Sequence, residues 1–209
     1  MTVVTLSASY GAGGSQIGPR LAERLGLEFI DRAIPTTVAA RLAVPVDDAL
    51  AHDEAAVRGV LERLLLRFAP AAQTFAGATP APELVDERSY LRCTEDVIRE
   101  AAARGAVILG RAGAIVLADA PDALHVRLDG PRERRLAQAM ALEGVDRETA
   151  ERHLRETDRA RLAYVEQFYG SDQRDPALYH LVIDSTVFAL DATVELIAVA
   201  AAARADPAS

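Results

Sequence analysis

The sequence predicts a three-layer α/β/α fold, in which helices cover both faces of a five-stranded parallel sheet. Short apolar runs of strand type alternate with longer helical patterns along the 209 residues. This order is typical of parallel sheets with crossover helices. Some of the runs are apolar at every position, as strands buried on both faces are. A chain of this length can build one sizeable core, so we expect a single domain over 1–209.

A β-branched apolar run that begins at Val3 predicts the first strand, which we place at the centre of the sheet. A loop with three glycines follows it. Residues 15–24 then have an amphipathic helical pattern, and Gly26 provides the stop signal for that helix. The short apolar run 27–30 predicts the second strand.

The stretch 33–104 is helical in pattern. Pro45 and Pro70 interrupt its apolar periodicity, and residues 70–82 are rich in Pro, Ala, Gly and Thr, which predicts a loop. A helix is expected again over 83–104. We expect the whole stretch to form a helical cap beside the sheet, like an insertion.

Three more strands are expected in the second half of the chain. The last two are each followed by a helical pattern, and Pro131 occupies the first turn of one of these helices. The predicted strands are 106–109, 124–129 and 181–183, and the last two helical patterns cover 146–169 and 191–204.

Composition narrows the class of protein. A net charge of −8 argues against a general nucleic-acid surface. The single cysteine, Cys93, excludes an internal disulfide, and four scattered histidines give no support to a metal cluster. No leader pattern and no bilayer-length apolar run are visible. We therefore expect a cytoplasmic protein with no membrane partner, and a homodimer stays open.

The glycine-rich loop after the first strand is the leading candidate site. A strand, a glycine-rich turn and a helix present backbone N–H groups and a helix N-terminus to a phosphate. The alternative is a tight turn that binds nothing, because glycines also serve helix–strand packing. The candidate phosphate-binding residues are Gly11, Ala12, Gly13, Gly14, Ser15 and Gln16.

This loop departs from the motif G-x-x-x-x-G-K-[ST]. Ser9 stands for the first glycine, Ser15 for the lysine and Gln16 for the Ser/Thr. The backbone cradle survives, whereas the side chains that reach the phosphates and Mg²⁺ do not. The chain has no lysine, so all 23 basic residues are arginine. Any phosphate charge must be met by arginine, whose planar fork binds phosphate oxygens well.

Charged residues follow two of the predicted strands. Asp31 and Arg32 end the second strand, and Arg111 comes directly after the third. Ligands bind at the carboxyl ends of strands in open α/β sheets. For each position a surface turn or a structural ion pair is the alternative. Arg155, Arg159 and Arg161 recur in a helical pattern rich in acidic residues, which also fits a solvated face with i,i+4 pairs.

The order of these motifs resembles the nucleoside monophosphate kinase group, and most closely the cytidylate kinase-like family. The resemblance spans nearly the whole chain, although no single motif is specific. The stretches that carry it are YGAGGSQIG at 10–18 with LAERLG at 21–26, FIDR at 29–32, VILGR at 107–111, and DRARLAY at 158–164 with YHLVID at 179–184.

The resemblance implies a P-loop kinase-like fold that transfers phosphoryl groups from ATP, with Mg²⁺, to a nucleoside monophosphate such as CMP. It makes 33–104 the acceptor-binding region and 146–175 a lid. Arg159 and Arg161 then become catalytic lid residues, and Asp31, Arg32 and Arg111 acceptor-binding residues.

Two departures keep other functions open. The loop lacks its lysine, and Ala112 follows Arg111 where cytidylate kinases have Asp. A nucleotide-binding regulator without transfer activity is the main alternative. A kinase for another small acceptor, such as a nucleoside or a sugar, is the second alternative, since the fold supports many acceptors.

Overall fold

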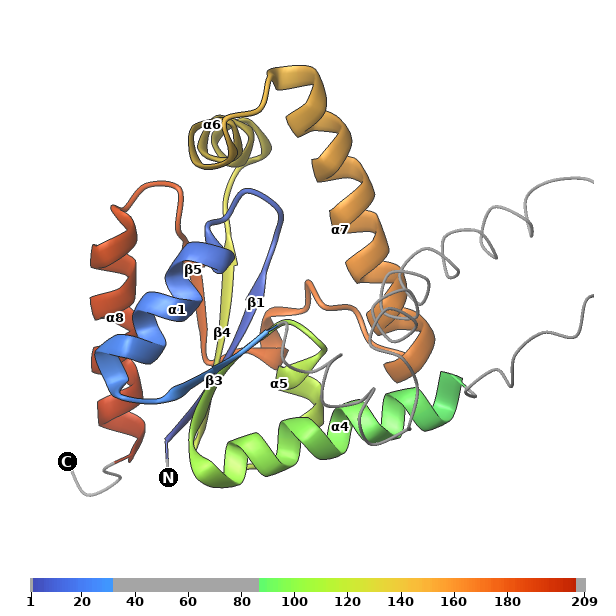
Figure 1. Ribbon diagram of the computed structural model, residues 1–209, viewed down its shortest axis with the longest axis vertical. Coiled ribbons are helices and arrows are strands. Elements are labelled where there is room, and N and C mark those ends of the chain that lie inside the picture. Colours follow the sequence, from blue (N-terminus) through green and yellow to red (C-terminus); the bar gives the residue numbers. More distant parts are fainter. Residues whose placement is uncertain (1, 32–86, 206–209) are drawn as a thin grey trace, which may run out of the picture.

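The computed structural model describes residues 2–31 and 87–205 of the chain. Most of the predicted region 33–104, and with it Arg32, therefore lies outside the described residues. The described part is an all-parallel five-stranded sheet with helices on both faces (Figure 1), which confirms the predicted fold class.

The strand order is β2-β3-β1-β4-β5, so the first strand lies at the centre of the sheet as predicted. Because every pairing is parallel, all five carboxyl ends lie at one edge. The strands are β1 (Val3–Ala8), β2 (Glu28–Ile30), β3 (Ala106–Leu109), β4 (Ala123–Asp129) and β5 (Leu181–Asp184).

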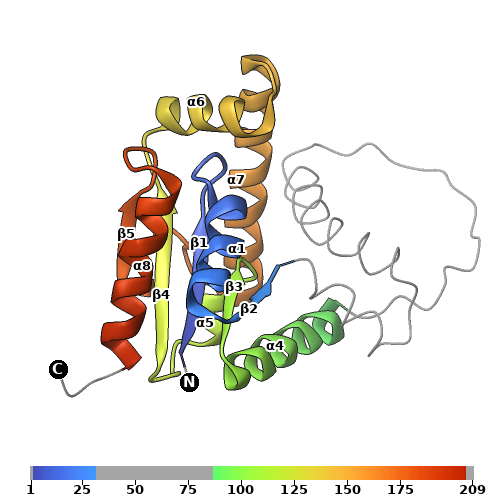
Figure 2. The ribbon, with the colours of Figure 1, turned by 60° about the vertical axis from the view of Figure 1, so that its left-hand side comes forward.

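Two helix layers bury the two faces (Figure 2). Helices α1 (Gly14–Leu25) and α8 (Leu190–Ala205) cover one face, and α4 (Glu87–Arg104) and α5 (Gly113–Val116) cover the other. Side chains alternate between the faces along β1: Val4 and Leu6 join the core under α1 and α8, whereas Val3 joins the opposite core.

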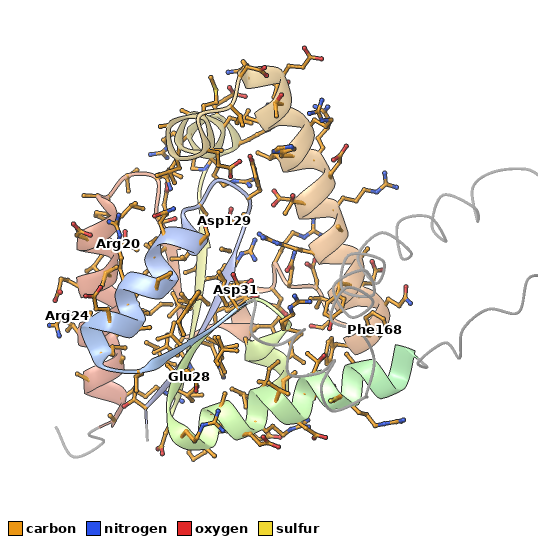
Figure 3. All side chains as sticks on the ribbon, viewed as in Figure 1. Arg20, Arg24, Glu28, Asp31, Asp129 and Phe168 are labelled. Carbon is orange, nitrogen blue, oxygen red and sulfur yellow. The ribbon has the colours of Figure 1, made fainter. Side chains whose placement is uncertain are left out.

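Ion pairs on the outside tie α1 to α8. Arg20 Nη1 lies 2.8 Å from Asp191 Oδ1, and Arg24 Nε lies 2.7 Å from Glu195 Oε1. Figure 3 shows both arginines on α1 on the side of α8. All four side chains are at least 45% exposed, so each pair is worth at most about 1 kcal/mol.

Helix α4 differs from the predicted cap. Its apolar face packs on the sheet with β3, where Val97, Ile98 and Ala101 are buried. The 87–104 part of the predicted region is thus a layer of the fold itself. A 3.6-residue apolar period shows that a face is buried and leaves open which surface buries it.

Two further helices follow β4, and Figure 1 shows the first of them beyond the carboxyl end of that strand and the second running back from it, past the sheet, toward α4. They are α6 (Arg132–Glu143) and α7 (Arg147–Tyr169), and we call them the α6–α7 hairpin. Gly144 ends α6 in a left-handed conformation, and the Asp146 side chain accepts the Thr149 N–H at the start of α7. A small core around Leu136 and Leu154 holds the hairpin together. A 3₁₀ turn at Pro176–Leu178 leads from it into β5.

No helix within 2–31 and 87–205 has the length and apolarity to span a membrane.

Candidate functional site

A cleft of about 1030 Å³ opens at the carboxyl edge of the sheet. The end of β1, the glycine-rich loop and the turn after β3 form one side, and the α6–α7 hairpin forms the other. Asp31, at the end of β2, also lines the cleft (Figure 3). The cleft brings together Gly11, Gly13, Gly14, Ser15, Gln16, Asp31, Arg111 and Arg161; Ala12 is buried behind it.

The loop ends at the N-terminus of α1. Gly13 is the N-cap residue with φ +77°, and its carbonyl oxygen accepts the N–H groups of Gln16 and Ile17 at 3.0 and 2.9 Å. Among the described residues, no acceptor meets the N–H groups of Gly14 and Ser15. The unpaired N–H groups and the positive end of α1 together favour an anion.

The close packing of the loop explains two of its glycines. A Cβ on Gly11 would lie 2.2 Å from the backbone oxygen of Arg135 on α6, and φ there is +77°. A Cβ on Gly14 would lie 2.6 Å from the Cβ of Ala8. Only residues without a side chain let the loop pass this close to α6 and β1.

The turn after β3 carries backbone strain. Arg111 and Ala112 have φ values of +55° and +54°, directly after Gly110 at +79°. A left-handed conformation costs a residue with a side chain roughly 1–2 kcal/mol. Such strain persists where the surroundings enforce it, often at binding sites. Here it accompanies a half-buried arginine that lines the cleft.

Arg161 lies close enough to Arg111 to affect the pKa of that guanidinium. Burial lowers the pKa of Arg111, and Arg161 lowers it further, whereas Tyr164 and Asp31 raise it. The Arg161 side chain is exposed to solvent through the cleft. The surrounding protein nevertheless desolvates its guanidinium and lowers its pKa, whereas Asp158 and Asp31 raise it. Arg111 and Arg161 thus form a pair of neighbouring cations in the cleft, and Asp31 is the carboxylate that acts on both.

Arg161 reaches the start of the glycine-rich loop. Its Nη1 donates to the carbonyl oxygen of Ala8, the last residue of β1, at 2.5 Å. On α7, Thr157, Ala160 and Tyr164 line the cleft on the same face as Arg161, at spacings of three and four residues. A cation therefore stands beside a loop that has no lysine of its own.

Arg159 does not join this cluster. It is exposed and is not among the residues that line the cleft. Positions two apart on a helix face away from each other, so Arg159 and Arg161 cannot both point to the cleft from one placement of α7. Arg155 pairs with Glu151 at 4.0 Å, one of the i,i+4 pairs that the sequence pattern also allowed.

A buried arginine on β4 supports the beginning of the loop. Arg127 is 6% exposed, and its Nη2 donates to Ser9 Oγ at 3.0 Å and to Asp129 Oδ2 at 2.9 Å. Burial raises the pKa of Asp129, but Arg127, the Gly130 N–H and Ser9 outweigh it, and the net pKa falls. Asp129 therefore stays ionised and holds Arg127 against the loop.

Sequence reasoning missed four residues around the site: Tyr10, Arg127, Arg135 and Asp158. Asp158 Oδ1 accepts the Tyr10 N–H at 2.8 Å, and Asp158 Oδ2 accepts from Arg135 Nη1 at 2.7 Å. One signal was available for Arg127, since an arginine inside an otherwise apolar strand is rarely buried without partners. No local pattern marks the contacts of the other three.

Two curated relatives are named cytidylate kinase. The relative from Methanopyrus kandleri is 36% identical over 108 residues, which are 47% of this chain and 56% of that protein. The match therefore spans little more than half the length of that relative. The relative from Ignicoccus hospitalis is 25% identical over 197 residues, which cover 94% of this chain and 97% of that protein.

Solved structures with the same fold include an uncharacterized protein from Eubacterium ventriosum, with a TM-score of 0.66 and 18% identity over 97% of this chain and 99% of that one. A gluconokinase from Sinorhizobium meliloti aligns with a TM-score of 0.52 and 15% identity over 99% and 94% of the two chains. These likenesses support the kinase-type fold alone.

The sequence profile of the cytidylate kinase-like family matches residues 3–187, from β1 to the end of β5 and beyond. The chain therefore belongs to the cytidylate kinase-like family.

Proposed function

We propose that this protein transfers the γ-phosphoryl group of ATP to a nucleoside monophosphate such as CMP, or to a related small acceptor. One observation carries the proposal: the anion-binding loop and the Arg111–Arg161 pair line one cleft at the carboxyl edge of the sheet. A cleft of about 1030 Å³ offers room for two ligands side by side. The names of the two curated relatives favour CMP within this class.

Phosphoryl transfer needs alignment and charge compensation more than covalent help from the protein. The N–H groups of Gly14 and Ser15 would bind the donor phosphates at the N-terminus of α1. Arg111 would hold the acceptor phosphate. Arg161, which contacts the end of β1, would supply the positive charge that a lysine supplies in the standard loop.

The cleft also suits a hydrated Mg²⁺ that arrives with the nucleotide. Mg²⁺ takes oxygen ligands and usually keeps several waters, with one or two protein oxygens and the substrate phosphates. The Ser15 hydroxyl and the Asp31 carboxylate both line the cleft and provide such oxygens. When bound there, the ion would offset the negative charge of the phosphates.

The test is turnover of purified protein with ATP and Mg²⁺ across a panel of monophosphates, nucleosides and sugars. Arg161→Ala should lower turnover by about 10³-fold while ATP binding changes far less, since charge stabilisation acts mainly in the transition state. Arg159→Ala is the matched control on the same helix, and we expect it to stay within about threefold because its side chain lies outside the cleft. Equal losses in both variants would restore Arg159 as a catalytic residue.

The missing lysine and Ala112 favour a second candidate, a nucleotide-binding protein without transfer activity. The same assay separates the two. Wild-type protein that binds ATP, yet turns over no acceptor with Mg²⁺ or Mn²⁺, is a regulator and not a kinase. Mass spectrometry of co-purified ligands and thermal shift across nucleotides would then identify the bound nucleotide.

A further inference from the structure

Tyr10 lies in the glycine-rich loop, and the α6–α7 hairpin holds its main chain on both sides. The Tyr10 N–H donates to Asp158 Oδ1 of α7 at 2.8 Å. The Tyr10 carbonyl oxygen accepts from Arg135 Nη1 of α6 at 2.8 Å. Asp158 and Arg135 also pair with each other at 2.7 Å, so one ion pair between the helices fixes both polar groups of this loop residue.

The same hairpin holds the Tyr10 side chain. Its hydroxyl donates to Glu143 Oε2, at the end of α6, at 2.6 Å. Its ring lies edge-on to His153 of α7, with 5.9 Å between the ring centroids, and packs against the small core inside the hairpin. Burial and Glu143 raise the pKa of Tyr10, so the hydroxyl keeps its proton and remains a donor.

Next to Tyr10, Gly11 passes so close to α6 that a Cβ would overlap the Arg135 backbone. The loop at residues 10–11 is thus pressed against α6 on one side and tied to α7 on the other. The N–H groups that would bind phosphate begin three residues further on, at Gly14. Their directions depend on how residues 10–11 are held, because only the buried Ala12 and Gly13 lie between, which leaves few φ and ψ angles that can change.

We propose that Tyr10 is a positioning residue through which the α6–α7 hairpin sets the shape of the phosphate-binding loop. The proposal rests on the proposed function for its ligand, a nucleotide phosphate. Arg161 lies one turn after Asp158 on α7. A shift of α7 therefore moves both the cation and the loop, and binding at the loop is coupled to the position of the hairpin.

The experiment compares Tyr10→Ala with Tyr10→Phe in the full chain. Tyr10→Ala loses the ring packing and the Glu143 hydrogen bond, and we expect the Kd for ATP to rise about tenfold or more, the equivalent of roughly one hydrogen bond or small packing contact. Tyr10→Phe keeps the ring and should stay within about threefold, since it loses only the hydroxyl contacts with Glu143 and His153 at the edge of the hairpin. Arg147→Ala is the control, because Arg147 ties the hairpin by surface pairs with Glu133 and Glu151 and does not touch the loop.

Hydrogen exchange gives a readout independent of turnover. Tyr10→Ala should speed exchange of the loop peptide 9–16 while the strands exchange as in wild type. In wild type, ATP should slow exchange in both the loop and the hairpin. In Tyr10→Ala the effect on the hairpin should be smaller, because only the main-chain hydrogen bonds to Asp158 and Arg135 remain. Unchanged loop exchange and an unchanged Kd in Tyr10→Ala would overturn the proposal.

Two further results complete the design. If Tyr10→Ala does not fold, Tyr10→Leu replaces it, because leucine keeps apolar volume in the hairpin core and loses the hydroxyl and the ring. If wild type binds ATP and Tyr10→Ala shows faster loop exchange, but no acceptor is turned over, the positioning role stands and the kinase function fails. If wild type binds no nucleotide, loop exchange alone decides the positioning role.

Discussion

The sharpest test of the loop geometry is Gly11→Ala. A Cβ at this position would lie 2.2 Å from the backbone oxygen of Arg135 and 2.8 Å from its carbonyl carbon. Neither atom can move unless α6 or the loop moves. The substitution also forces an alanine into φ +77°, a conformation that costs roughly 1–2 kcal/mol.

The steric overlap adds a second cost to the conformational cost of the positive φ. Overpacking a well-packed site typically costs about 1–3 kcal/mol. We therefore expect Gly11→Ala to lower the free energy of unfolding by about 2–5 kcal/mol. This is a large fraction of the roughly 5–15 kcal/mol that hold a domain of this kind together.

Gly144→Ala is the matched control. Gly144 has φ +68°, and no described atom lies within 4 Å of the Cβ position. Gly144→Ala should therefore lower the free energy of unfolding by the conformational cost alone, about 1–2 kcal/mol. The difference between the two variants, about 1–3 kcal/mol, isolates the close approach of the loop to α6.

Both variants would be unfolded in urea, and an unchanged m-value would show that the midpoints report stability alone. ATP binding would be measured by calorimetry. Gly11→Ala should also lose ATP affinity, because the overlap displaces the loop, whereas Gly144→Ala should bind as wild type. Equal destabilisation of the two variants would refute the close approach. Gly13→Val is a less clear test, since it would meet the movable ends of Gln138 and Leu190, each at 3.0 Å.

Two further predictions concern the core. The pKa of His125 is lowered from 6.5 to about 4, chiefly by burial, so the folded protein resists its protonation while the unfolded chain accepts a proton near pH 6.5. Stability should fall from this group as pH drops from 6.5 to 4, by about 3 kcal/mol at ~1.4 kcal/mol per pKa unit. His125→Gln should flatten the denaturation profile over that window, and an unchanged profile would contradict the argument. Gly18→Ala would place a Cβ 2.5 Å from Phe29 Cε2 and should cost about 1–3 kcal/mol; Phe29→Leu in the same chain should recover part of this loss in a double-mutant cycle, and strictly additive effects would contradict the contact.

The fold could be predicted from local patterns because the strands are short, apolar and regularly separated by helices. The expected strand over 106–109 is observed with the same bounds, and the helix expected over 15–24 extends by one residue at each end. The central place of β1 follows from the same alternation. Parallel strands need crossover helices, and this requirement leaves few topologies.

The local sequence also predicted that the glycine-rich loop belongs to the site. Gly11, Gly13 and Gly14 stand between a strand and a helix, and both flanking elements are visible in the sequence. The turn Gly110–Arg111 follows a buried strand in the same way. Because carboxyl ends of parallel strands meet at one edge, the sequence alone was enough to bring Arg111 and the loop to the same cleft.

What the sequence by itself determined, then, are the elements and the edge at which they present charged and glycine residues. The tertiary structure decided which side of each element meets which neighbour. It separates Arg161 from Arg159, two residues away on the same helix, and it joins Tyr10 to Asp158 across 148 positions of the chain. Periodicity fixes the angle between side chains on one helix, whereas the orientation of that helix comes from its packing against the hairpin core and the loop.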